Sequence, residues 1–294
     1  MLASGPAMAQ APQSPDDAWW TGPMLANSAH TLPKGHMLIE SYLYDAISGS
    51  TNSVNSLTYL LYGATDRLTL GLVPTAGHNS VRGGEDSSGI QLGDTQLRAQ
   101  YGLTSLDAAR GIPDLAIALI ETVPTGRHDR LGTRPSDGFG NGAYTTALAF
   151  YSQMLFWMPN GRLLRTRQDL SQSISRRTAV EDVSVYGTGR GFRGHARPGN
   201  AFSADLAFEY SLTRNWVLAL DVIYNHGNEA IARGTQSGRP VALNSGTSDS
   251  LGFAPAIEFS WTPNIGVLGG VRIIPKGHNA PASLTPAIAI NYVL

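Results

Sequence analysis

The chain has 294 residues, including 33 Gly, 17 Pro, 11 Tyr and no Cys, and a formal net charge of −1. The lack of Cys excludes disulfides, thiolate metal sites and Cys nucleophiles, and the balanced charge gives no reason to expect a nucleic-acid partner. Charged residues make up only 15% of the chain, against roughly 25% in soluble globular proteins, and no run of 18 apolar residues exists. A membrane could therefore be crossed only by strands.

The first residues, "MLASGPAMAQA", contain Ala7-Met8-Ala9, which fits the small-x-small cleavage pattern of a secretory signal. We expect residues 1–9 to be the remnant of a signal peptide that starts upstream; an Ala-rich disordered terminus is the alternative. Residues 10–33 carry two adjacent tryptophans, Trp19 and Trp20. We interpret them as a periplasmic segment that either caps the barrel or folds into its lumen as a plug, with an unstructured leader as the alternative.

From residue 34 onward, apolar and polar residues alternate, a pattern that predicts strands with two different faces. In "FSADLAFEY", Phe202 and Leu206 share one face and Asp205 and Glu209 the other. Strands of about nine to eleven residues match a tilted crossing of the hydrocarbon core, whereas soluble strands are shorter. The predicted strands are 34–45, 55–63, 68–75, 90–101, 115–123, 143–158, 162–173, 200–210, 216–226, 249–261, 266–274 and 283–294.

Five similar corners, each marked by an aromatic residue before a short turn, recur at intervals of roughly 40 to 55 residues, enough for two strands and a connection. The opposite connections are mostly longer, near 76–89, 124–142, 174–199 and 227–248, although 102–114 is long for the short-turn side. This asymmetry is typical of outer-membrane barrels, whose short turns are periplasmic. The sequence predicts an all-β fold: residues 34–294 form a single antiparallel up-and-down transmembrane β-barrel of 12 strands, with short periplasmic turns, long extracellular loops and both termini periplasmic.

Aromatic residues gather beside the short turns and the chain end. Amphipathic rings favour the membrane interface, where an apolar body meets lipid and a polar edge meets water. The predicted aromatic girdle is Tyr62, Tyr101, Trp157, Tyr210, Trp216, Trp261 and Tyr292.

The segments "AHTLPKGHMLIESYLYD" (29–45), "YGATDRLTLGL" (62–72), "LGDTQLRAQY" (92–101) and "ETVPTGRHDRLGT" (121–133) resemble the bacterial outer-membrane family labelled "MetA-pathway of phenol degradation". The likeness extends over about 29–294. It implies an outer-membrane barrel linked to uptake of aromatic compounds, and it carries over no catalytic or binding residue. Such barrels usually end in Phe or Trp as a signal to the barrel-assembly machinery, whereas this chain ends in Leu294.

Charged residues of the polar strand faces are expected to point into the lumen. They form either a structural network that satisfies buried charge or a pore lining that sets selectivity, and the two roles are compatible. A 12-stranded barrel is intermediate between filled and open barrels, so we expect a narrow or plugged passage. The candidate lumen residues are Glu40, Asp94, Arg98, Arg165, Arg167, Asp205, Glu209, Asp221, Glu258 and Arg272.

Other motifs are weak. "GRGFRG" (189–194) matches a dinucleotide fingerprint but lacks the strand and helix context. Instead we expect Arg190, Arg193 and Arg197 on a flexible extracellular loop, either contacting lipopolysaccharide phosphates or simply solvated. The seven His show no metal-binding spacing, so no metal or cofactor is expected. Neither G-x-S-x-G nor the H-x-S-N-G of barrel phospholipases occurs.

The sequence therefore favours a channel for passive uptake of small, aromatic or hydrophobic molecules rather than an enzyme. The alternatives are a non-conducting structural barrel or a barrel enzyme of the phospholipase type. Charges of mixed sign in the lumen would largely cancel at distance and favour neutral or weakly charged solutes.

Overall fold

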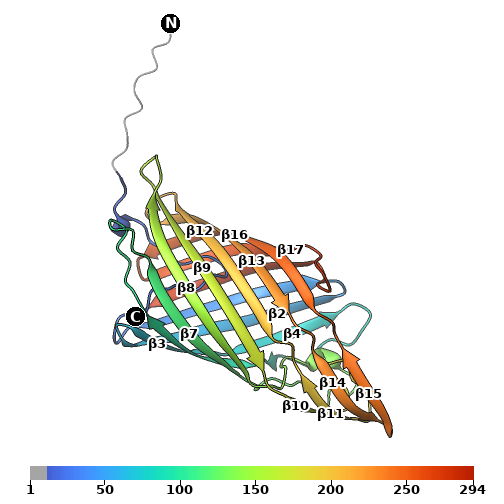
Figure 1. Ribbon diagram of the computed structural model, residues 1–294. Helices are drawn as coiled ribbons and strands as arrows, with labels where there is room; N and C mark the ends of the chain where they lie inside the picture. The colour runs from blue at the N-terminus through green and yellow to red at the C-terminus, as the bar shows by residue number, and fades with distance from the viewer. Residues whose placement is uncertain (1–11) are drawn as a thin grey trace.

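The computed structural model describes residues 12–294, so the predicted signal-peptide remnant, residues 1–9, lies outside the described residues. Twelve antiparallel crossings form a closed barrel, as the sequence predicts (Figure 1). Two three-residue 3₁₀ helices, η1 (Pro15–Asp17) and η2 (Pro135–Asp137), lie outside the barrel wall. None of the helices within residues 12–294 is long and apolar enough to span a membrane.

The barrel wall follows the chain order, and β18 returns to pair with β1, where Tyr42 lies opposite Ala289. This pairing leaves no free edge, which is the condition for a sheet to span a bilayer. The wall strands are β1 (Met37–Ser48), β2 (Thr51–Thr65), β3 (Leu68–Val73), β4 (Thr75–Val81), β5 (Gln91–Leu92), β6 (Thr95–Gly102), β7 (Asp114–Val123), β8 (Thr145–Trp157), β9 (Leu163–Ser175), β12 (Ala201–Ser211), β13 (Trp216–Gly227), β16 (Ser248–Thr262), β17 (Ile265–Ile274) and β18 (Ser283–Val293).

Two crossings are split into two labelled strands each. Strands β3 and β4 both pair with β2, and β5 and β6 pair with β4 and β3 respectively. Between β3 and β4, Pro74 cannot donate a hydrogen bond, but its carbonyl accepts one from the Thr58 N–H at 3.2 Å. The crossing continues through this proline, so the predicted connection 76–89 was wrong at its start.

Both ends of the barrel sequence lie at the short-turn rim. The backbone N–H of Met37 donates to the Leu294 carbonyl at 3.0 Å, and the Leu294 N–H donates to the Met37 carbonyl at 2.8 Å. Along the same rim, 103–113 is the long exception that the sequence indicated. Outward positions alternate with buried ones: Leu206 is 39% exposed and Leu218 45%, whereas Ala207 and Glu258 are 0% exposed. This alternation agrees with the predicted inner and outer faces.

A small second sheet extends beyond the opposite rim (Figure 1). Its strands are β10 (Thr178–Glu181), β11 (Phe192–Arg197), β14 (Ile231–Gln236) and β15 (Arg239–Asn244). One face buries Val180, Phe192, Ala196 and Ala232. The long connections 174–199 and 227–248 therefore contain strands of their own that the sequence did not predict, and Arg193 and Arg197 lie on β11 and not on a flexible loop.

Candidate functional site

The N-terminal segment, residues 12–34, first follows the short-turn rim. The Gln13 N–H donates to the Gly161 carbonyl and the Trp19 N–H to the Arg214 carbonyl, each at 2.8 Å. Arg214 also forms an ion pair with Asp17. These contacts hold the start of the segment against the β8–β9 and β12–β13 turns.

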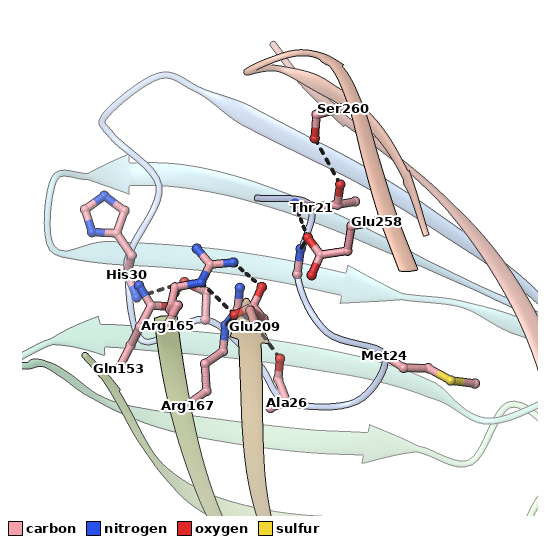
Figure 2. A network of polar contacts seen from close by, with 12 residues as sticks. Thr21, Met24, Ala26, His30, Gln153, Arg165, Arg167, Glu209, Glu258 and Ser260 are labelled. Carbon is pink, nitrogen blue, oxygen red and sulfur yellow. Dashed lines mark hydrogen bonds and ion pairs between the residues drawn. The ribbon is translucent and has the colours of Figure 1, made fainter. Parts of the chain in front are cut away.

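The segment then enters the barrel and meets a carboxylate on β16 (Figure 2). Oε2 of Glu258 accepts the N–H groups of Thr21 at 2.7 Å and Gly22 at 3.0 Å. The Thr21 and Ser260 hydroxyls lie 3.2 Å apart. An irregular segment has no ladder partner for its N–H groups, so buried carboxylates on the wall satisfy them.

Asp221 on β13 binds the next part of the segment. Its carboxylate accepts the backbone N–H groups of Met24 at 3.0 Å, Leu25 at 3.3 Å and Ala26 at 3.0 Å. Met24 packs against the small inner-wall residue Ala254 and its neighbours Leu268 and Ala289. Charge-assisted bonds to three successive amides fix the backbone shape of this turn.

Asn27 connects the segment to two further strands. The Asp169 carboxylate on β9 accepts its backbone N–H at 2.7 Å and its side-chain Nδ2 at 2.9 Å. Arg98 on β6 donates to Asn27 Oδ1 at 2.8 Å and to the Tyr151 hydroxyl at 2.7 Å. Gln100 Nε2 donates to the Ser28 carbonyl at 2.9 Å.

The segment returns to the short-turn rim at His30. Its Nδ1 lies 3.5 Å from the Asp114 carboxylate, and the hydrogen bond to Asp114 raises the pKa of His30. The Thr31 hydroxyl donates to the Asp66 carbonyl at 2.8 Å, and the Lys34 N–H to the Asp66 carboxylate at 3.0 Å. The segment thus enters and leaves the barrel at one end.

A buried charge cluster lies beneath the segment (Figure 2). Glu209, which is 0% exposed, pairs with both Arg165 and Arg167; the Nε atoms lie 2.6 Å and 3.0 Å from its Oε2. Arg167 also donates to the Ala26 carbonyl at 3.1 Å, and the Arg165 guanidinium lies 4.5 Å from the Trp20 ring centroid. The three charges are satisfied by one another and by the segment, as buried charge requires.

The structure distributes the ten candidate lumen residues among several environments. Six contact the N-terminal segment or the cluster beneath it, and they come from five strands. Asp94 instead accepts the N–H groups of Gly126 at 3.0 Å and Asn141 at 2.8 Å, so it anchors the 124–144 connection. Asp205, Glu40 and Arg272 make no hydrogen bond to the segment among residues 12–294. The six are Arg98, Arg165, Arg167, Glu209, Asp221 and Glu258.

The candidate lumen residues did not include Asp169, Asp114 or Gln100. Asp169 shares its strand face with Arg165 and Arg167, so the period of two could have found it. For Asp114, at the first position of β7, and for its partner His30, no sequence signal indicated the pairing. Six of the predicted girdle residues are 41% to 56% exposed. Tyr210 is half-buried, and its hydroxyl accepts a hydrogen bond from Asn160 at 2.7 Å.

Two cavities remain beside the segment, on the side of β1 and β2. The larger, about 290 Å³, is lined among others by Trp20, Glu40, Leu61 and Thr69. The smaller, about 160 Å³, lies beside it, and both are lined by Met24, Leu25, Tyr42 and Tyr59. Among residues 12–294, no cluster of three or more His, Asp or Glu could hold a metal ion.

The family model described as "Putative MetA-pathway of phenol degradation" matches residues 22–273. The chain belongs to this family. The match includes most of the inserted segment as well as the barrel, so the segment is part of what the family model describes. A comparison with curated protein sequences gives no match.

Among solved structures, the chain is similar to the COG4313 outer membrane channel from Pseudomonas putida F1. The two share 16% identity with a TM-score of 0.67, over 92% of this chain and 100% of that chain. At this identity the likeness establishes the outer-membrane barrel fold. The NanC porin aligns over 86% of this chain and 98% of its own at 9% identity, with a TM-score of only 0.49.

Proposed function

We propose that this family member is an outer-membrane channel for passive uptake of small molecules, with both termini in the periplasm and the N-terminal segment as its plug. The carrying observation is the placement of the two cavities. The segment is hydrogen-bonded to β6, β9, β13 and β16, and the cavities of about 290 Å³ and 160 Å³ lie between the segment and strands β1 and β2. The plug therefore narrows the lumen and leaves space on the side of β1 and β2.

The favoured solutes are small and neutral or weakly charged, including simple aromatic and hydrophobic molecules. The inner wall carries paired charges of both signs, such as Arg167 and Glu209 at 3.0 Å, and paired charges act weakly at distance. The family description, which names phenol degradation, agrees with aromatic cargo. The similarity to a protein described as an outer membrane channel supports the channel itself.

Transport is favoured over a purely structural barrel because a structural barrel gains nothing from internal cavities. A phospholipase-type enzyme would need a nucleophile beside a base. In the polar network on the inner wall, the carboxylates of Asp221 and Glu209 instead contact backbone N–H groups and guanidinium groups.

The proposed partners outside the barrel are lipid, lipopolysaccharide and the barrel-assembly machinery. The exposed residues Arg193 and Arg197 lie on one face of β11. His195 of the same strand pairs with the exposed residue Arg233 of β14. Such a cationic face matches lipopolysaccharide phosphates, and nearby Arg190 would add to it. The girdle would mark the periplasmic lipid boundary, and β18 would present Tyr292 to the assembly machinery.

The test is conductance across planar bilayers, with liposome swelling, for the intact chain and for a variant lacking residues 12–32. We expect the deletion to raise conductance and solute entry several-fold while the barrel keeps its heat-dependent gel mobility. A folded deletion variant that admits no solute would exclude the channel.

A further inference from the structure

The smaller cavity is built from four neighbouring wall strands and the plug. Tyr42 and Tyr44 come from β1, Tyr59 from β2, Thr285 from β18 and Arg272 from β17. In the β17–β18 register, Arg272 and Thr285 are direct partners, so their side chains share the inner face. Met24 and Leu25 of the plug close the cavity on the opposite side.

Two polar groups of this cavity lack partners. Within residues 12–294, neither the buried Nε of Arg272 nor the buried hydroxyl of Thr285 makes a hydrogen bond. A buried donor left unsatisfied is costly, and a native structure rarely tolerates two side by side. Both groups can donate but are fully covered, so an acceptor that entered the cavity and displaced the atoms that cover them would satisfy both.

The charge of Arg272 is also uncompensated. None of the ion pairs among residues 12–294 includes it, whereas Arg165 and Arg167 both pair with Glu209. A guanidinium presents a planar fork of donors that fits a carboxylate with two parallel hydrogen bonds. The expected acceptor is therefore an anion, and a carboxylate in particular.

The rest of the cavity is suited to an aromatic ring. Its volume of about 160 Å³ is close to that of an apolar cavity of roughly 150 Å³ that accommodates benzene. The ring centroids of Tyr42 and Tyr59 are 6.2 Å apart in an edge-to-face arrangement. A further aromatic ring could pack edge-to-face against either of them. Leu57 and Ala287 complete an apolar wall.

We propose that this cavity is a binding site for single-ring aromatic carboxylates of the benzoate class. The carboxylate pairs with Arg272 and accepts the Thr285 hydroxyl, while the ring lies among Tyr42, Tyr44 and Tyr59. This site deepens the proposed function, since it would give the channel a preferred solute at a defined point of the passage.

Calorimetric titration of the full chain in detergent micelles tests the site with benzoate, acetate and benzyl alcohol. We expect benzoate to bind at least tenfold more tightly than acetate, which lacks the ring, or benzyl alcohol, which lacks the charge. Arg272→Gln should weaken benzoate binding at least tenfold and Thr285→Val about threefold. The control Arg110→Gln, at a side chain 79% exposed on a periplasmic-side turn, should leave binding unchanged.

Equal benzoate affinity in the intact chain and in Arg272→Gln would overturn the proposal, as would no benzoate binding by the intact chain. Equal affinity for benzoate and acetate would overturn the aromatic part. Each variant is first checked for folding by its heat-dependent gel mobility. If Arg272→Gln does not fold, Thr285→Val alone tests the site. Benzoate binding without conductance would contradict the channel but support the site. Conductance without benzoate binding would support the channel but contradict the site.

Discussion

The Asp221 carboxylate and the Ala26 backbone N–H lie 3.0 Å apart although 195 residues separate them in the chain. Asp221 also accepts the Met24 and Leu25 N–H groups, so one side chain of the barrel wall orders a whole turn of the plug.

Replacing Asp221 by Asn should loosen the plug. The neutral amide accepts more weakly than the carboxylate, and hydrogen bonds to charged groups contribute about 1.5–3 kcal/mol each. We expect about tenfold faster proteolysis within residues 20–28 and higher conductance. The matched control is Asp205→Asn, on the neighbouring strand, whose buried Oδ1 has no partner among residues 12–294; equal effects of both changes would contradict this anchoring role.

Replacing Glu209 by Gln should destabilise the barrel by about 3–5 kcal/mol, because the buried charges of Arg165 and Arg167 would lose the one carboxylate that pairs with both. The midpoint of urea unfolding in micelles measures the effect. Glu181→Gln serves as control: its pair with Arg130 is exposed, with side chains 49% and 67% accessible, and such pairs contribute at most about 1 kcal/mol.

The contact between His30 and Asp114 should make plug docking depend on pH. The hydrogen bond to Asp114 raises the pKa of His30 above 6.5 in the docked state. Docking is therefore stabilised below that ordinary value, and this contribution is lost as the pH rises through the raised pKa. From pH 6 to pH 8 we expect conductance to increase by at most about fivefold, because the His30 side chain is 62% exposed. A His30→Gln variant should lose this dependence; an unchanged pH profile would refute the assignment.

Leu206→Arg should impair assembly, since Leu206 is 39% exposed on the outer face of β12 and a cation on the lipid face near the bilayer midplane costs about 2–4 kcal/mol. Ser203→Arg, on an inward position of β12, should assemble far better. The folded fraction by heat-dependent gel mobility compares them, and equal folding would mean that the faces are misassigned.

The barrel was predictable because its two faces meet different surroundings. "FSADLAFEY" places Asp205 and Glu209 on one side in any straight strand, and the structure buries both. The interruption at Pro74 between β3 and β4 and the small sheet were not predictable in this way. Strands β10 and β11 are only four and six residues long, and Gly194 and Gly234 within the sheet interrupt any apolar pattern.

Only half of the candidate site follows from sequence. The wall residues Arg165, Arg167 and Asp221 belong to alternating strands. The plug shows no regular alternation of apolar and polar residues, because carboxylates far away in the chain shape its backbone. Glu258, for example, lies at least 236 residues from the amides that it binds. Its location inside the barrel therefore becomes visible only in three dimensions.

Both ends of the plug lie at one rim: Gln13 contacts Gly161, and Lys34 contacts Asp66. Withdrawal through this rim would thus require breaking hydrogen bonds but no unthreading of a chain end through the barrel. The withdrawn residues would stay tethered to β1 at a high effective concentration. Gating would then be a reversible first-order process, with opening and closing rates that do not depend on protein concentration.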